Sequence, residues 1–465
     1  MADGTRQITV VGGGITGLAA AHRLLTQAPE DDDLRVTVLE ASGRFGGWIR
    51  TEEFAGRPVD FGPDSLLTRA PWAAQLAAEL GIAEDLVAPA AGTSLLLSRG
   101  RLRVLPRGIM AGLPDGPMPF VRSGLLGPLG VARAGLDLVL PANAPAADES
   151  IGALIRRRFG NQVLERVIDP LLGGVHAGRC DDLSLRATAP QFAAAATADR
   201  SLLKGLRATA PPPPPPGTPP PTVFQAPREG MGQLVARLLE ELEADPRTTL
   251  QTGARVDRLS ALDADAVVLA VPAYAAAPLI ADAAPEAAAT LSALPYATIT
   301  HITLAYDPQQ LPALPNDATG FLVTRPEGLL MTACTFVNRK WDRDASGDAF
   351  VIRCSAGRID DQRAETMDDD ALIAAITGEL RSVLGISAQP TESRVTRYPQ
   401  AMPQYRPGHL DRIDAVTAQL TQALPQVRLA GAAYRGSSVP NCIRDGRDVA
   451  DDLLQQTKHE EQHHG

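Results

Sequence analysis

A glycine-rich turn near the N-terminus constrains the fold of this chain more than any other feature. A short apolar run, Ile8–Val11, leads directly into Gly12–Gly17 (GGGITG), and an Ala/Leu-rich helical pattern follows to about Thr26. A second apolar run, Arg35–Leu39, then ends at Glu40. This order of strand, glycine turn, helix and strand predicts a βαβ unit that opens a parallel sheet. The predicted fold class is therefore α/β, with a Rossmann-type domain.

The residues of this unit have separate tasks in binding a dinucleotide. Gly12 permits the tight turn, Gly14 lets the backbone approach a pyrophosphate, and Gly17 lets the helix pack closely on the strand. The N–H groups at the start of the helix face the phosphate charge. Glu40 is placed to accept hydrogen bonds from ribose hydroxyls. The cofactor residues predicted here are Gly12, Gly14, Ile15, Thr16, Gly17, Glu40 and Ala41.

Composition excludes several classes of protein. The formal net charge of −10 over 465 residues argues against a nucleic-acid-binding protein. The four cysteines are scattered without metal-ligand spacing, which indicates free thiols in a reducing cytoplasm and no metal site. The N-terminus leaves no room for a signal peptide, and no apolar run is long enough for a transmembrane segment.

The rest of the chain alternates between helical and strand patterns. A run of prolines at 211–221 predicts a polyproline II spacer or surface loop, with a ligand for a proline-binding partner as the alternative. The other predicted elements are a helix at 72–81, a hairpin at 94–106, a helix at 230–244, strands at 248–260 and 264–272, strand alternation over 296–355, a helix at 369–385, a strand at 427–431 and a closing helix at 446–456.

The residues that follow Glu40 point to FAD rather than NAD. Arg44-Phe45-Gly46-Gly47-Trp48 resembles the second flavin signature of the amine-oxidase-like flavoproteins. Arg44 can offset pyrophosphate charge, and the paired glycines let the chain run against a flavin without a Cβ clash.

Three further segments resemble the protoporphyrinogen/coproporphyrinogen oxidase family of FAD-dependent enzymes. They are Gly62–Ser65 (GPDS), Pro170–Gly178 followed by Asp182–Ser184, and Gly431–Ile443 followed by Arg444–Arg447. Together with the first fifty residues they fall in the family's order along nearly the whole chain. The further cofactor residues that the resemblance implies are Arg44, Gly46, Gly47, Trp48, Gly62, Pro63, Asp64, Ser65, Val256, Gly431, Val439, Pro440, Cys442 and Ile443.

The resemblance also implies a domain plan. The FAD-binding domain would be built from discontinuous segments at 1–90, 223–290 and 425–465. A β-rich substrate-binding domain would take 291–424, with short pieces near 91–94 and 206–222. A helical domain at 95–205 would cover the active-site cavity, and in relatives this domain can touch a membrane.

The activity that the resemblance implies is the six-electron oxidation of a porphyrinogen to a porphyrin in haem synthesis. Hydride would pass to flavin N5 in three rounds, and O₂ would be reduced to H₂O₂. The backbone oxygen of Gly174 is a candidate partner for pyrrole N–H groups, and His176 is a candidate general base. His22 and His301 are interpreted as structural. FAD is expected to be non-covalent, one per chain, because Cys442 lies outside the sequence context of covalent flavin attachment. The resemblance also admits contact with a downstream enzyme of haem synthesis.

One departure bears on the substrate. Many protoporphyrinogen oxidases carry a propionate-binding arginine before the hairpin, where this chain has Ser94. Recognition of the carboxylates must then come from elsewhere, and the candidates are Arg99, Arg101, Arg325, Arg339 and Lys340. The altered anchor and the soluble character favour coproporphyrinogen III, with protoporphyrinogen IX as the alternative. More distant alternatives are an amine oxidase, a carotenoid desaturase or a flavoprotein without turnover; the aromatic content of 4% disfavours an aromatic cage for an amine.

Overall fold

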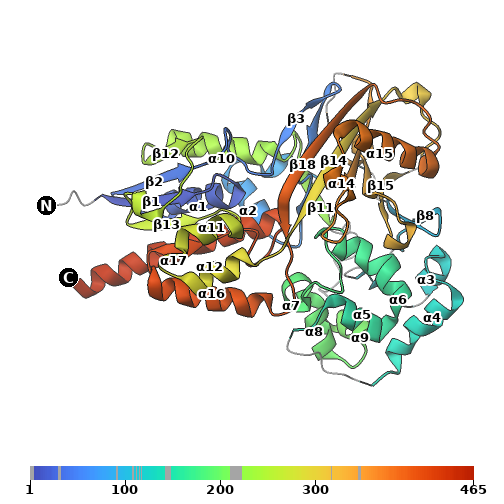
Figure 1. Cartoon of the computed structure of the whole chain (residues 1–465), viewed down its shortest axis with the longest axis horizontal. Coiled ribbons are helices and arrows are strands. Elements are labelled where there is room, and N and C mark those ends of the chain that lie inside the picture. Colours follow the sequence, from blue (N-terminus) through green and yellow to red (C-terminus); the bar gives the residue numbers. More distant parts are fainter. Residues whose placement is uncertain are drawn as a thin grey trace.

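A computed structural model of the chain describes residues 5–29, 33–90, 93–106, 109–110, 113–114, 116, 118–141, 148–209, 222–315, 317–343 and 347–464. The proline run at 211–221 lies outside these residues, so the interpretation as a spacer stays a prediction. Figure 1 shows three parts: a parallel sheet with its helices, which also holds both termini, a large second sheet, and a group of helices.

The parallel sheet confirms the predicted α/β class. Its strand order is β12-β2-β1-β13-β19, and every neighbouring pair is parallel. Its strands come from three separated stretches of the chain: β1 (Arg6–Val11), β2 (Leu34–Leu39), β12 (Thr248–Gln251), β13 (Ala266–Leu269) and β19 (Val427–Leu429). The central strand β1 is buried from Ile8 to Val11, as expected for a strand covered on both faces.

Helices cover both faces of this sheet. One core contains buried side chains from α1 (Ile15–Gln27), α2 (Trp72–Glu79), α10 (Gly232–Ala244) and α17 (Val439–His464). A second core contains those of α11 (Ala273–Ile280), α12 (Pro285–Ser292) and α16 (His409–Ala423). Helix α17 begins seven residues before the predicted start at 446, because Ser438 accepts a hydrogen bond from Asn441 N (3.3 Å) and Pro440 fits the first turn of a helix.

The second sheet has seven strands in the order β18-β14-β17-β16-β15-β7-β8. All neighbours are antiparallel except β15 and β7, which are parallel. Helix α15 (Asp369–Leu384) packs on one face, capped by Asp368 at its start. The strands are β7 (Thr93–Ser98), β8 (Arg101–Val104), β14 (Tyr296–Tyr306), β15 (Ala318–Val323), β16 (Met331–Phe336), β17 (Phe350–Ala356) and β18 (Glu392–Pro403). The predicted hairpin is therefore present as β7 and β8, but it belongs to this sheet and not to the helical part expected from residue 95.

The helical part follows β8 and has its own hydrophobic core. Its elements are α3 (Met118–Ser123), α4 (Pro128–Gly135), the short helix Leu136–Leu138, α5 (Ile151–Phe159), α6 (Asn161–Val163), a π-helix at Leu164–Gly173, α7 (Leu185–Thr188), α8 (Pro190–Ala198) and α9 (Leu202–Thr209).

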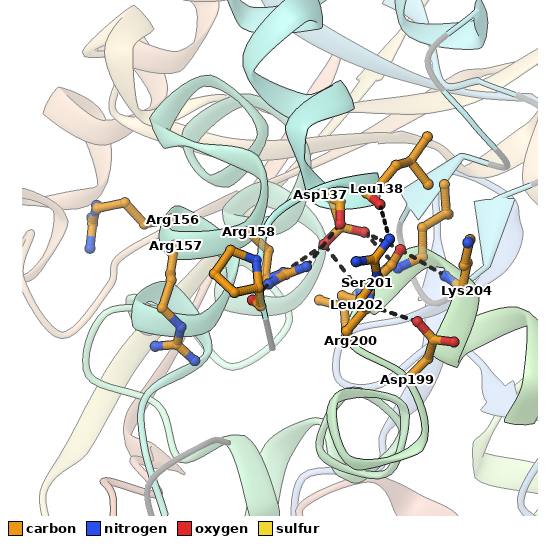
Figure 2. A network of polar contacts seen from close by, with 12 residues as sticks. Asp137, Leu138, Arg156, Arg157, Arg158, Asp199, Arg200, Ser201, Leu202 and Lys204 are labelled. Carbon is orange, nitrogen blue, oxygen red and sulfur yellow. Dashed lines mark hydrogen bonds and ion pairs between the residues drawn. The ribbon is translucent and has the colours of Figure 1, made fainter. Parts of the chain in front are cut away.

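A buried ion pair ties this core together (Figure 2). Arg158 Nε donates to Asp137 Oδ1 at 2.6 Å, and the two side chains are 5% and 1% exposed. The Asp137 carboxylate also accepts hydrogen bonds from Ser201 Oγ (2.7 Å), Leu202 N (3.1 Å) and Leu203 N (3.0 Å). Asp137 therefore fixes the start of α9 relative to α5.

Candidate active site

The first glycine turn joins the end of β1 to the start of α1. Gly12 has φ +111°, a conformation that side chains rarely adopt, and a Cβ on Gly17 would lie 1.9 Å from Gly12 O. The N-cap residue of α1, Gly14, supplies no side-chain hydrogen bond. The N–H groups of the first helical turn, including those of Ile15 and Thr16, are therefore free for an anionic ligand.

Glu40, just after β2, lies beside this turn. Its Oε2 accepts a hydrogen bond from Gly13 N and its Oε1 from Ser42 N, both at 2.8 Å. Its backbone oxygen accepts a hydrogen bond from Ala254 N at 2.9 Å, which brings the segment of Val256 to the same edge of the sheet. The strand predicted over 248–260 ends at Gln251, so Val256 lies in irregular chain.

The loop around Gly46 and Gly47 lies directly against the first turn. Gly46 N donates to Gly13 O at 2.8 Å, and a Cβ on Gly47 would lie 3.2 Å from Gly14 Cα. Arg44 donates to the carbonyl oxygens of Phe45 and Ile49, both at 3.1 Å, and to that of Gly47. Its guanidinium thus folds the loop back on itself, which places the two glycines beside the helix start.

The turn at Asp60–Ser65 is fixed by side chains from β17 and from the short helix α13 (Val337–Lys340) that follows β16. Asp64 pairs with Lys340 Nζ (2.8 Å) and with Arg353 Nη2 (2.7 Å). Burial would raise the pKa of Asp64, but these two cations outweigh it and hold that pKa well below its usual range. Asp64 therefore faces the sheet as a carboxylate, with the Ser65 hydroxyl bonded to it at 3.0 Å.

The carbonyl oxygen of Phe61, in the same turn, accepts hydrogen bonds from His301 Nδ1 (2.9 Å) and from Tyr398 Oη. Burial, aided by Arg353, lowers the pKa of His301 to about 4, so the ring is neutral and carries its proton on Nδ1. Trp48, 42% exposed, meets the ring of Tyr398 edge-on at 5.2 Å. Sequence reasoning did not identify Tyr398, whereas the interpretation of His301 as structural agrees with its hydrogen bond to Phe61 O.

The C-terminal segment that begins at Gly431 lies against the start of α1. Gly431 N donates to Asp445 Oδ2 at 2.7 Å, and a Cβ on Gly431 would lie 3.7 Å from Thr16 Oγ1. Burial raises the pKa of Asp445 to about 6. Burial also raises the pKa of Cys442, in the first turns of α17 with Val439, Pro440 and Ile443, to about 12. The Cys442 thiol therefore stays protonated, which makes it a poor nucleophile.

Gly174 and His176 lie in a second glycine-rich turn, Gly173–Gly178. Gly174 O accepts a hydrogen bond from Ala177 N at 3.2 Å. Burial lowers the pKa of His176 to about 4, so its imidazole is neutral at physiological pH. No hydrogen bond to this imidazole is formed within the described part of the chain, and the nearest aromatic neighbour is Tyr405, at 6.4 Å between ring centroids.

Tyr405, which the sequence did not single out, connects Ser184 to the C-terminal segment. Its hydroxyl donates to Ala432 O and accepts a hydrogen bond from Gly436 N at 3.1 Å. Its backbone oxygen accepts a hydrogen bond from Ser184 N at 2.6 Å. Tyr405 thus links two of the predicted segments of the site, Asp182–Ser184 and Gly431–Ile443.

Three of the five candidates for carboxylate recognition are already engaged. Arg325 pairs with Asp169 and Asp360, Lys340 pairs with Asp64, and Arg339 donates to Pro315 O. Arg99 and Arg101 lie at the exposed turn between β7 and β8.

The converging residues fit a flavin dinucleotide. The free N–H groups of α1 suit a pyrophosphate, and Glu40 suits a ribose. The side of Gly14 on which a Cβ would stand is open, since the nearest heavy atom, Gly47 Cα, is 3.9 Å away. Within the described residues, His, Cys, Asp and Glu form no group that could hold a metal ion. No helix among those residues combines the length and apolar character that crossing a membrane requires.

Comparison with known proteins decides the family. The family model of flavin-containing amine oxidoreductases matches residues 15–454. The chain belongs to this family. Members carry a flavin, and the coproporphyrinogen III oxidase of Bacillus subtilis is 34% identical over 98% of this chain and 99% of its own. The coproporphyrinogen III oxidase of Mycobacterium leprae is 36% identical over 94% of this chain and 96% of its own.

Solved structures of this family share the fold. A crystal structure from Exiguobacterium sp. 255-15, named for the protoporphyrinogen oxidases, superposes with a TM-score of 0.85 at 30% identity. The match covers 97% of this chain and 99% of the Exiguobacterium chain. The predicted resemblance to the flavoproteins of porphyrin synthesis is therefore confirmed at the level of family and fold.

Proposed function

We propose that this flavoprotein uses FAD to oxidise coproporphyrinogen III to coproporphyrin III in haem synthesis. Removal of six hydrogens from the macrocycle, with reduction of three O₂ to three H₂O₂, balances the reaction. The observation that carries the proposal is the convergence of Gly12–Gly17, Glu40, Gly46–Gly47 and Gly431 on one edge of the parallel sheet, beside the Gly173–Gly178 turn. Near full-length similarity to bacterial coproporphyrinogen III oxidases supports the choice of substrate.

The protein's task in this reaction is to bind and orient. Bound FAD supplies the acceptor for hydride and returns the electrons to O₂. The start of α1 binds the pyrophosphate, and Glu40 binds a ribose. The start of α17, at Val439, directs the positive end of the helix dipole toward the site, which favours negative charge on a reduced ring. The Gly174 carbonyl is placed in a turn where it can accept a pyrrole N–H. His176 is neutral at pH 7 and can accept a proton, but the burial that lowers its pKa to about 4 makes it a weak base.

The proposal includes non-covalent FAD, one per chain. The buried, protonated thiol of Cys442 supports this, because covalent attachment requires a nucleophilic sulfur. Denaturation should release intact FAD into the supernatant. Yellow colour that stays with the precipitated chain would contradict this part of the proposal.

The domain plan and the location are further parts of the proposal. We infer an FAD-binding domain from 1–90, 223–290 and 425–465, supported by the origin of the five strands of the parallel sheet. A cytoplasmic location is supported by the four cysteines, which are all reduced and buried.

Protoporphyrinogen IX is the second candidate substrate, favoured by the name of the Exiguobacterium structure. The test compares rates with coproporphyrinogen III and protoporphyrinogen IX, followed by porphyrin fluorescence and O₂ uptake. A higher kcat/KM for coproporphyrinogen III is expected. Equal or reversed preference would overturn the choice of substrate, and O₂ uptake with amines but with neither porphyrinogen would move the protein to the amine oxidases.

A further inference from the structure

The Gly173–Gly178 turn is held by donors that lie far from it in the sequence. The backbone oxygens of its last three residues all accept hydrogen bonds. Gln404 Nε2 donates to His176 O (2.8 Å), Ile359 N donates to Ala177 O (2.9 Å), and Arg325 Nη2 donates to Gly178 O. These donors follow strands of the seven-stranded sheet, whereas the turn belongs to the helical part.

Arg325 is the centre of this arrangement. Its Nε donates to Asp169 Oδ2, its Nη1 to both carboxylate oxygens of Asp360 (2.9 and 2.7 Å), and its Nη2 to Gly178 O. The planar guanidinium therefore uses all three nitrogens at once, a geometry that lysine cannot reproduce. This engagement removes Arg325 from the residues that could bind a substrate carboxylate directly.

Asp169 holds the turn from the other side. It lies in the π-helix Leu164–Gly173, a rare helix type that often marks functional sites. Its backbone oxygen accepts a hydrogen bond from Gly174 N (2.8 Å), and its Oδ1 accepts one from Cys180 N (2.9 Å). Asp169, with its side chain 9% exposed, therefore bonds Gly174 in the turn, Cys180 just after the turn, and Arg325.

The tip of the turn is the part left free. The side chain of Val175 is 64% exposed, although its neighbours on both sides are fixed. A Cβ on Gly174 would lie 2.3 Å from Pro170 O, so only glycine fits at this position of the tip without a shift of the neighbouring backbone. Ala177 is held at φ +48°, a left-handed conformation that the hydrogen bond from Ile359 helps to keep.

We propose that Arg325 and Asp169 are positioning residues, which fix the Gly174–Val175 tip and thereby set how the substrate is held for hydride transfer. The proposal rests on the proposed function, which assigns this turn to the substrate. Neither residue touches the substrate or the cofactor. Their effect passes through the backbone of the turn.

The test uses the purified holoenzyme and the variants Arg325→Gln, Arg325→Lys and Asp360→Asn. For Arg325→Gln, kcat/KM for coproporphyrinogen III is expected to fall about 10- to 100-fold, because small misplacements at a reacting centre have effects of that size. Arg325→Lys should recover part of the loss, and Asp360→Asn, which keeps the bonds of Arg325 to Asp169 and Gly178, should lose least. Flavin content and the rate at which O₂ reoxidises the photoreduced flavin should stay within about twofold of wild type.

A structural role alone would produce a different result. Asp137→Asn disturbs the buried pair elsewhere in the helical part and is expected to lower thermal stability while KM stays unchanged. If Arg325→Gln does not fold, Arg325→Lys and Asp360→Asn decide the question. KM and kcat within twofold of wild type in every variant that folds would overturn the proposal. A wild-type enzyme that oxidises no porphyrinogen would instead overturn the proposed function.

Discussion

The two glycine-rich turns of the site are built in different ways. The hydrogen bonds that hold the first, Gly12–Gly17, come from residues within the first fifty, among them Glu40 and Gly46. The second, Gly173–Gly178, is fixed by Asp169 from the preceding helix and by Arg325, Ile359 and Gln404, which lie about 150 or more residues further along the chain. A turn of the first kind can be recognised from a short motif, whereas a turn of the second kind depends on the tertiary fold.

The largest expected effect tests whether the first turn faces the cofactor. Gly14→Val should fold, because the space around a Cβ at this position is open to 3.9 Å, but its isopropyl group occupies the proposed pyrophosphate site. We expect complete loss of FAD and of activity, measured as flavin absorbance per chain. Gly43→Val is the matched control, since a Cβ there meets nothing within 4 Å, and it should keep its FAD. A yellow Gly14→Val protein would contradict the placement.

Acid should destabilise the fold through its buried histidines, one of which, His176, lies in the second turn. Burial lowers the pKa of His176, His301 and His409 to about 4, whereas an unfolded histidine has a pKa of about 6.5. Between these values the unfolded chain binds protons that the folded chain does not. The free energy of unfolding should therefore fall by about 1.4 kcal/mol per pH unit for each histidine as the pH drops from about 6.5 toward 4.

Asp445 acts in the opposite direction, because its raised pKa of about 6 makes the folded state bind a proton first. Burial also lowers the pKa of His22 and raises that of Asp448, so four histidines act against two carboxyl groups and the net effect of acid is destabilising. Urea unfolding at pH 7.5 and 5.0 measures the loss in the free energy of unfolding for wild type and for His176→Asn. The variant should lose less than wild type when the pH is lowered. Equal stability of wild type at both pH values would count against this account.

The next prediction asks whether the geometry of the second turn depends specifically on the Arg325–Asp169 pair, or on any buried ion pair in the helical part. Asp137→Asn leaves Arg158 buried without its partner and should lower the free energy of unfolding by about 3–5 kcal/mol, with KM unchanged. Asp181→Asn breaks the more exposed pair with Arg156 and should cost at most about 1 kcal/mol. A raised KM in Asp137→Asn would contradict the distinction between the Arg325–Asp169 pair, which positions the turn, and the Arg158–Asp137 pair, which only stabilises the helical part.

The smallest expected effect concerns the hydrogen bonds that Tyr405 makes to the C-terminal segment. Tyr405→Phe removes the hydroxyl that bonds Ala432 O and Gly436 N and should cost about 1–2 kcal/mol of stability. FAD should be retained with an affinity lowered severalfold, measured by fluorescence on dilution. Unchanged stability and FAD affinity would show that this connection is not needed.

The sequence predicted the parts of the molecule in which neighbouring residues determine the structure. The strand, turn and helix around Gly12 were predicted correctly, as were the hairpin that includes Ser98 and the helix that starts at Asp369. The hairpin was nevertheless assigned to the wrong part, because its pairing partner, β15, lies more than two hundred residues away. The engagement of Arg325 could not be predicted for the same reason, since nothing near it in the sequence identifies Asp169 or Gly178 as its partners. Asp169 lies four residues before Gly173, and this proximity is the sequence signal that could have linked Asp169 to the turn.

The origin of the strands has a further consequence for how such enzymes can diversify. Among the described residues, neither the parallel sheet nor the seven-stranded sheet takes a strand from between Val104 and Thr248. The helical part is thus a single excursion of the chain that carries its own core. Evolution can therefore exchange or reshape this excursion while the cofactor scaffold stays intact, provided that its contacts with the rest of the chain are kept, among them the hydrogen bonds to His176 O, Ala177 O and Gly178 O. In engineering terms, the helical part is the replaceable module and those three carbonyl groups belong to its connector.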